Sequence, residues 1–179
     1  KCLKHCDIPD IWKEAVITPI YKGKGEKSDP AQYRPISLTS QIIKLMGRIV
    51  RSYLIQYLEL NAAFPDSQHG FRPNRSTVTQ LLEQYEAILD ALCSQSNIDS
   101  IMFYYAQAFD KIKHTILLHN LRNLGISGQI GKWLGHFLLN RTQRVSLHGH
   151  LSSPSPVISG VPQGTILGPV RFLTYKADI

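Results

Sequence analysis

The sequence predicts an α+β fold, on the basis of its composition and of the order of its apolar patterns. The chain has 179 residues, of which 43% are hydrophobic and 18% are charged. This composition is typical of globular proteins, and the length favours one compact domain. Segments with helical periodicity are mixed with a few short apolar segments typical of strands, so we expect helices and a small sheet in one domain.

Two long helices are predicted in the first half of the chain. Ser40 can cap the first of them. Its apolar positions fall on one helical face, namely Ile42, Leu45, Met46, Ile49, Val50, Tyr53 and Leu54. The second begins near Thr77, which has capping-box spacing with Gln80. Its expected buried stripe consists of Val78, Leu81, Leu82, Tyr85, Ile88 and Leu89.

Shorter elements are predicted in the second half. One helix is expected near residues 114–124, where Gly125 ends it, and another near 128–139, where Ser127 can cap it. The expected strands are apolar segments bounded by polar residues, at 9–21 after an initial turn, 98–105, 143–147 and 157–159. The expected loops are rich in Gly, Pro or charge, at 22–35, 61–75 and 160–168.

The charge of the chain is compatible with a polyanionic partner. Twenty Lys and Arg against thirteen Asp and Glu give a net charge of +7. Three of the lysines, Lys22, Lys24 and Lys27, lie in one predicted loop, where they could track the phosphates of a nucleic acid. A solvated loop with lysines that bind nothing explains the same pattern.

The cysteines and the apolar runs exclude several classes of protein. Three cysteines without a repeated spacing argue against a disulfide framework. Cys2 and Cys6 flank His5 and could form half a zinc site, but no second pair follows, so no metal is expected there. No apolar run is long enough to cross a bilayer, and the polar start does not resemble a signal peptide. We therefore expect an intracellular protein with no membrane partner.

Six segments in order resemble the polymerase domain of non-LTR (LINE-type) retrotransposon reverse transcriptases. They are WKEAVITPIYKGKG at 12–25, YRPISLT at 33–39, QHGFRPNRST at 68–77, AQAFDKIKH at 106–114, GVPQGTILGP at 160–169 and FLTYKADI at 172–179. Each alone is a short motif, whereas six in order across nearly the whole chain form a specific pattern. Group II intron and other reverse transcriptases share the palm arrangement, so they are an alternative ancestry. The sequence GVPQGTILGP at 160–169 favours the non-LTR group.

The resemblance implies a fold and an activity. The fold is the fingers and a partial palm of a right-hand polymerase, with residues 1–95 as the fingers-like region and 96–179 as the partial palm. The activity is RNA-directed DNA polymerisation, with an RNA template, a DNA primer and deoxynucleoside triphosphates (dNTPs) as partners. Such enzymes use two Mg²⁺ ions, which prefer carboxylate ligands.

The metal site of the family is not expected to be intact in this chain. Counting back from Ala108-Phe109-Asp110 places Tyr104 where the family has its first metal-binding aspartate. A phenol is neutral at pH 7 and is a poor ligand for Mg²⁺. The resemblance places two further aspartates on a hairpin downstream of Ile179, and Asp110 and Asp178 are expected to be structural or solvent-facing. No catalytic residue and no metal ligand is therefore predicted, and Mg²⁺ binding is doubtful.

The resemblance also implies nucleotide contacts. Arg72 and Arg34 are expected to pair with the triphosphate, because a guanidinium binds phosphate oxygens with two parallel hydrogen bonds. Gln163 and Gly164 are expected to lie over the incoming nucleotide. Phe109 is the expected steric gate, whose ring excludes a ribose 2′-hydroxyl. Each of these residues also has a purely structural explanation. The arginines could form surface ion pairs, the loop with Gln163 and Gly164 could be a plain turn, and Phe109 could be a core residue.

Three functional hypotheses follow from these features. The first is a reverse transcriptase domain that has lost catalysis. The second is a nucleic-acid-binding remnant without chemistry, supported by the basic charge. The third is an unstable pseudogene product with no role, in which an incomplete palm leaves apolar surface exposed.

Overall fold

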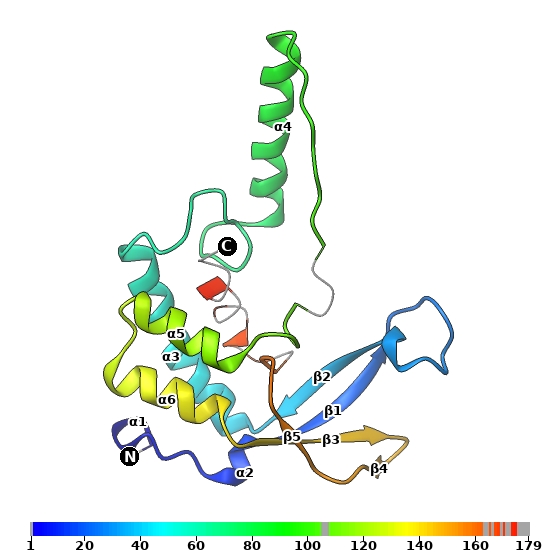
Figure 1. Ribbon diagram of the computed structural model, residues 1–179, viewed down its shortest axis with the longest axis vertical. Coiled ribbons are helices and arrows are strands. Elements are labelled where there is room, and N and C mark those ends of the chain that lie inside the picture. The colour runs from blue at the N-terminus through cyan, green and yellow to red at the C-terminus, as the bar shows by residue number, and fades with distance from the viewer. Residues whose placement is uncertain are drawn as a thin grey trace.

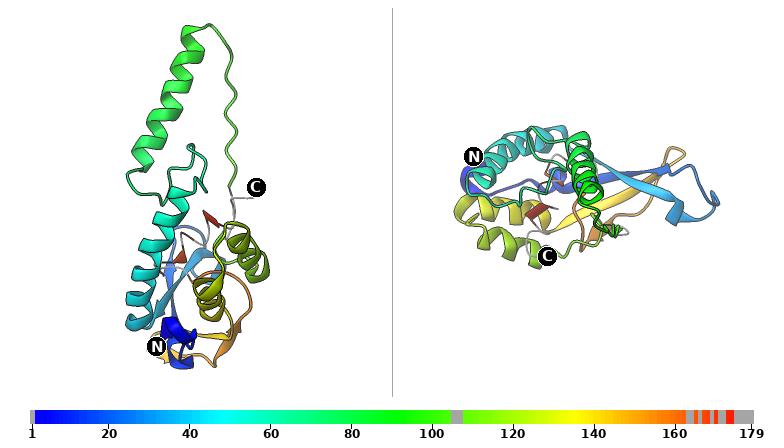
Figure 2. Two further views of the ribbon diagram at one scale, coloured as in Figure 1. Left: turned by 90° about the vertical axis from the view of Figure 1, so that its left-hand side faces the viewer. Right: turned by 90° about the horizontal axis from the view of Figure 1, so that it is seen from above.

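The computed structural model describes residues 2–104, 108–162, 165, 167, 168, 170, 173 and 174. A body of helices and a small twisted sheet forms one end of the molecule, and one long helix extends from it (Figures 1 and 2). The helices are α1 Cys2–His5, α2 Asp10–Lys13, α3 Gln41–Leu60, α4 Thr77–Cys93, α5 His114–Asn123 and α6 Gly128–Leu138. The strands are β1 Glu14–Tyr21, β2 Tyr33–Thr39, β3 Arg141–Leu147, β4 His150–Leu151 and β5 Ser155–Val157. This mixture confirms the α+β class.

The sheet has the strand order β2-β1-β3-β4, with β5 paired to β3. β1 and β2 form an antiparallel hairpin in which Ala15 faces Thr39 and Tyr21 faces Tyr33. β1 is parallel to β3, so the connection between them needs a long crossover, which the helices supply. The sheet therefore joins residues from both ends of the sequence.

β2 is an element that the sequence analysis missed. Residues 22–35 were expected to be a loop, but the strand begins at Tyr33, and Pro35 pairs in register with Pro19. β2 is at the edge of the sheet, where a missing N–H can face solvent, so a proline is tolerated. Proline is a sound loop signal in general, and it gave the wrong boundary here because the strand has only one partner.

The core is formed by α3, α5 and α6. Its fully buried members include Leu58, Leu117, Leu121, Trp133, Leu134 and Leu138. The Trp133 and Phe137 rings stack on one face of α6, with their centroids 5.7 Å apart. The predicted ends of α5 and α6 are confirmed: Gly125 has a φ of +79°, and Ser127 is the N-cap residue of α6, although its hydroxyl makes no capping hydrogen bond.

The helix α3 forms as predicted, but a different face of it is buried. Its buried residues are Ile43, Gly47, Val50, Leu54, Ile55 and Leu58. The predicted stripe was wrong for Ile42, Leu45, Ile49 and Tyr53, which are exposed. Apolar residues lie on two adjoining faces of α3, so periodicity alone does not say which face meets the core. Gly47 is on the buried face, and Leu167 packs within van der Waals distance of the place where a Cβ atom would stand.

The helix α4 is present as predicted, but its apolar stripe is not buried. Ser76 rather than Thr77 is the N-cap, and it forms a capping box with Thr79. None of the residues of α4 is buried, and the stripe that was expected in the core faces solvent. The ribbon views show why: α4 extends away from the body, and no other described helix or strand lies against it (Figures 1 and 2).

The predicted buried strand at 98–105 was also wrong, for the residues that the structure describes. Residues 98–104 form no strand and pair with none of the described strands. Their side chains are exposed to solvent, and the exposed fraction of Tyr104 is 93%. This segment returns toward the body beside α4 (Figures 1 and 2). An apolar sequence predicts burial only when a neighbouring strand is available to pair with it.

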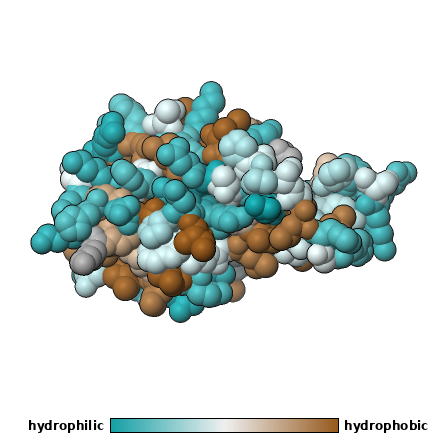
Figure 3. Space-filling model, turned by 90° about the horizontal axis from the view of Figure 1, so that it is seen from below, coloured by the Kyte–Doolittle hydropathy of each residue, from teal (hydrophilic) through white to brown (hydrophobic). Residues whose placement is uncertain are grey.

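The lower end of the body has a mixed surface. Seen from below, several hydrophobic patches are separated by hydrophilic side chains (Figure 3). Among the described residues, none of the helices has both the length and the apolar character required to cross a membrane.

Candidate nucleotide and nucleic-acid site

The basic loop lies at the tip of the β1–β2 hairpin. The ammonium of Lys22 donates to the carbonyl of Ala31 over 2.7 Å, and that of Lys27 lies 5.8 Å from the centre of the Tyr21 ring. The Tyr21 hydroxyl donates to the carbonyl of Gly25 over 2.5 Å. Lys22, Lys24 and Lys27 are all exposed. The loop therefore has a defined shape while its three cationic groups remain open to a ligand.

Arg34 lies on β2 and is exposed. Successive side chains of a strand point to opposite faces. Arg34 therefore faces away from its neighbours Pro35 and Ser37, which line a cavity on the other side. Among the described residues no hydrogen bond or ion pair engages its guanidinium. Its role as a triphosphate contact stays a prediction, and its position leaves it free to act.

Arg72 is engaged within the chain. Its Nε donates to Glu59 Oε1 over 2.9 Å and its Nη2 to Glu59 Oε2 over 2.7 Å. Its Nη1 donates to the carbonyl of Pro65 over 2.7 Å, and the guanidinium lies 5.6 Å from the centre of the Phe64 ring. The Arg72 hydrogen bonds lower the pKa of Glu59, and Glu59 in turn raises the pKa of Arg72.

This geometry joins the end of α3 to the loop before α4. The side chain of Arg72 is only 9% exposed, so a phosphate would have to displace Glu59 to reach it. The predicted nucleotide contact is untested, and the contacts that the structure shows are structural.

The base of α4 is held by a polar cluster around His69. The Nδ1 of His69 lies 2.7 Å from Thr79 Oγ1, and its Nε2 lies 2.5 Å from Glu83 Oε2. Arg75 completes the cluster through an ion pair of 2.9 Å with Asp66. His69 belongs to the 68–77 motif, and its contacts fix the direction in which α4 leaves the body.

Two of the predicted motifs are brought together by backbone hydrogen bonds. The amide of Gly160 donates to the carbonyl of Ile112 over 2.8 Å, and the amide of Val161 donates to the carbonyl of Phe109 over 2.9 Å. The His114 Nε2 lies 2.7 Å from the carbonyl of Gly160. The start of the glycine-rich loop is thereby fastened to the segment that carries the expected steric gate.

The side chain of Phe109 is half-buried. Its ring meets that of Phe71 edge to face, with the centroids 6.4 Å apart. The 68–77 and 106–114 motifs therefore touch through these two aromatic rings. The gate role of Phe109 remains a prediction. Gln163 and Gly164, the other expected nucleotide contacts, lie outside the described residues.

The described residues do not suit a pair of magnesium ions. Tyr104 stands at the position that the resemblance gives to an aspartate, and its phenol is exposed to solvent. Within the part of the chain that the structure describes, no three His, Cys, Asp or Glu side chains are close enough to hold a metal ion.

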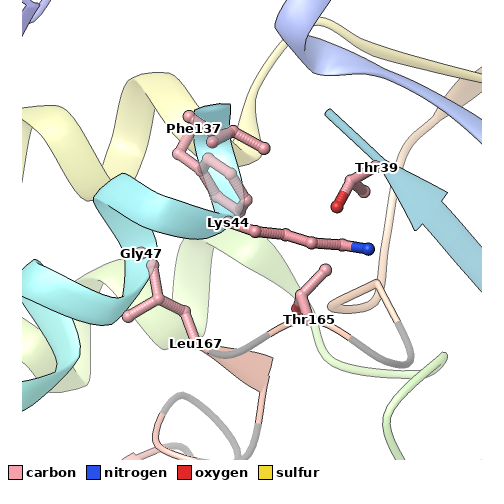
Figure 4. A pocket seen from close by; sticks show the side chains of 7 residues that line it. Thr39, Lys44, Gly47, Phe137, Thr165 and Leu167 are labelled. Carbon is pink, nitrogen blue, oxygen red and sulfur yellow. The ribbon is translucent and has the colours of Figure 1, made fainter. Parts of the chain in front are cut away.

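Two cations that no sequence pattern indicates, Lys44 and Arg141, line pockets next to described residues of the 160–169 motif. Lys44 of α3 reaches between Thr39 and Thr165 and lines a small pocket together with Phe137 (Figure 4). Arg141, the first residue of β3, is buried with its guanidinium 4.8 Å from the centre of the Phe137 ring. Neither residue belongs to a recognisable motif, so the fold and not the local sequence determines their surroundings.

Comparison with known proteins gives the ancestry of the chain. The family described as "Reverse transcriptase (RNA-dependent DNA polymerase)" matches residues 22–179. In Drosophila melanogaster, the "Probable RNA-directed DNA polymerase from transposon BS" is 35% identical over 172 residues, and the "RNA-directed DNA polymerase from mobile element jockey" is 33% identical over 171 residues. Each alignment covers 96% of this chain.

A third relative, the "Probable RNA-directed DNA polymerase from transposon X-element", is 33% identical over 171 residues. The chain spans about 19% of the length of these relatives. The matches cover both the hairpin and the segments around Gly160, and they agree with the order of motifs in the sequence. The chain therefore belongs to the reverse transcriptase family, as a domain of the kind found in non-LTR retrotransposons.

Proposed function

We propose that this chain supplies the fingers (residues 1–95) and part of the palm (residues 96–179) of an RNA-directed DNA polymerase, and that it binds nucleic acid without polymerising DNA by itself. The relatives' names support the polymerase ancestry. The observation that carries the loss of catalysis is Tyr104, an exposed phenol where a metal-binding carboxylate is expected.

The physical reason is electrostatic. Transfer of a nucleotidyl group develops negative charge on the attacking and leaving oxygens, and two metal ions held by carboxylates stabilise it. A neutral phenol supplies neither the charge nor the oxygen geometry that Mg²⁺ requires. The described residues offer no replacement cluster. Nucleotide and template contacts from Arg34, Phe109 and the lysines of the hairpin loop do not depend on that site.

Primer extension tests the loss of catalysis. The purified chain with Mg²⁺, an RNA template, a DNA primer and dNTPs is expected to give no extended product. The Tyr104→Asp variant is expected to give none either, because one carboxylate does not hold two ions. A jockey polymerase serves as the positive control. Template-dependent extension by the unmodified chain, or rescue by that single substitution, would refute the proposal.

Nucleic-acid binding is tested separately by the salt dependence of affinity. Titration of labelled RNA at several salt concentrations is expected to give a linear fall of log affinity against log salt. The triple variant Lys22→Ala, Lys24→Ala, Lys27→Ala is expected to reduce this slope by about 2, since each phosphate contact on a single strand contributes about 0.7.

Lys4 and Lys132 provide the matched control, because they are also lysines and lie on α1 and α6, away from the hairpin. Replacing both by alanine should leave the slope near its original value. Equal slopes for the triple variant and the unmodified chain would exclude the hairpin loop as the binding surface.

The third hypothesis, an unstable product, is tested by the same preparation. The buried core of α3, α5 and α6 favours a folded chain. A cooperative thermal transition is the result expected of a folded domain. A broad, non-cooperative transition would instead support the unstable product.

A further inference from the structure

The environment of Arg141 is unusual for a charged residue. Its side chain is among the largest that are fully buried, at 2% exposure. Its Nη1 donates to the carbonyl of Phe137 over 3.4 Å, whereas its Nε and Nη2 have no hydrogen-bond partner among the described residues. Burial lowers the pKa of Arg141 to about 10, so the guanidinium still carries its charge at pH 7.

A buried charge without a counter-charge is strongly unfavourable, and buried donors in proteins are almost always paired. The stacking of Arg141 on Phe137 stabilises the guanidinium only in part, because a ring quadrupole does not replace hydrogen bonds. The contrast with Arg144 on the same strand is informative. Arg144 is 37% exposed and pairs with Glu14 over 2.9 Å. The Nε and Nη2 of Arg141 therefore need a hydrogen-bond partner, and none of the described residues supplies one.

A cavity adjoins Arg141. It has a volume of about 380 Å³ and lies on one face of β1, β2 and β3, under residues 156–162. Besides Arg141 its polar wall includes Ser37, Gln143 and the carboxylate-bearing Asp110. A water molecule takes up about 30 Å³ of liquid, so the cavity has room for a small anion together with part of its hydration.

A second cation, Lys44, lines a separate small pocket. Phe137, on which Arg141 stacks, also lines that pocket, and the ammonium of Lys44 points between Thr39 and Thr165 (Figure 4). The hydroxyl of Thr39 is buried and has no hydrogen-bond partner in the described part of the chain. Thr39 and Ser37 are two positions apart on β2, so they face the same side of the sheet. Among the described residues of this region, Thr39 and Arg141 therefore carry buried donors without a hydrogen-bond partner.

We propose that this cavity is a binding site for a small oxyanion, a phosphate or a carboxylate, whose oxygens pair with Nε and Nη2 of Arg141. Those two nitrogens form the side of a guanidinium that fits two oxygens of such a group. The site lies on the opposite face of β2 from Arg34, so it is separate from the proposed triphosphate contact.

Thermal melting of the full chain at constant ionic strength tests the site. Replacing chloride by inorganic phosphate or pyrophosphate at about ten times the dissociation constant is expected to raise the melting temperature by about 3–5 °C, by preferential binding to the folded state. The Arg141→Met variant is expected to lose this rise and to melt no lower than the unmodified chain in chloride, because it removes an unpaired buried charge. Acetate and a dNTP as further probes distinguish a carboxylate, a free phosphate and a nucleotide as the source of the oxyanion.

Arg144→Met is the matched control on β3, and it should keep the full rise. Arg141→Lys keeps the charge and should retain part of the rise, so the test remains readable if Arg141→Met fails to fold. An equal rise in Arg141→Met would overturn the proposal. It would also be overturned if no anion has an effect while Arg141→Met and Asp110→Asn destabilise the chain equally in chloride, because Asp110 would then be the partner.

Discussion

Gly160→Ala is expected to lower the free energy of unfolding by about 3 kcal/mol, through backbone strain and a steric clash. Gly160 has a φ of +82°, a conformation that residues with a Cβ atom rarely adopt. An added Cβ would also stand 2.8 Å from the carbonyl oxygen of Asp110 and 2.9 Å from its Cα. Both are backbone atoms of a packed segment, so they have no free rotation by which to move away.

The measurement is chemical denaturation, with Gly149→Ala as the control. Gly149 has nearly the same φ, +81°, and nothing lies within 4 Å of its added Cβ. The Gly149→Ala variant should therefore lose only the contribution of backbone strain to the free energy of unfolding, about 1 kcal/mol. Equal losses in the two variants would contradict the close packing of the glycine-rich loop on residues 109–112. Weaker RNA affinity of Gly160→Ala at a temperature where it is folded would link that packing to binding.

Arg72→Met is expected to destabilise the chain by about 2–3 kcal/mol, because it leaves Glu59 partly buried and without its counter-charge. The methionine keeps much of the packing against Phe64, so the loss reports mainly on the hydrogen bonds. Arg75→Met is the matched control, since Arg75 pairs with the exposed Asp66 and its loss should cost at most about 1 kcal/mol.

The ion pair of Arg72 with Glu59 also predicts a pH dependence. The folded state lowers the pKa of Glu59, so the pair contributes stability above the usual glutamate pKa and loses it as the pH falls through the lowered value. The difference in stability between the unmodified chain and Arg72→Met should therefore shrink in acid. A difference that is constant from neutral pH to acid would show that packing, rather than the ion pair, gives Arg72 its effect.

The sequence predicted the elements whose signals are local. The end of α5 follows from Gly125, which has a positive φ, and the start of α6 follows from Ser127. Burial was predicted less well, because it depends on what else lies nearby. The apolar stripe of α4 and residues 98–104 have the composition of core elements, yet none of the described elements covers them.

The candidate site also has residues that the sequence identifies and contacts that only the structure shows. The resemblance located Arg34, Arg72 and Phe109, and the structure brings the motifs of Phe71 and Phe109 into contact. The partner of Arg72 is Glu59, thirteen residues away on another element, and no local pattern indicates such a pair. Arg141 carries no motif at all, because its importance arises from burial beside a cavity and not from its sequence neighbours.

The extended position of α4 has a consequence for optical measurements on this protein. The chain has two tryptophans, Trp12 and Trp133, and both pack in the body, so tryptophan emission reports on the body alone. Far-ultraviolet dichroism also counts the 17 residues of α4. Curves from the two signals coincide only if α4 loses its helix together with the body. Comparing them measures the coupling between the extended helix and the rest of the molecule without any label.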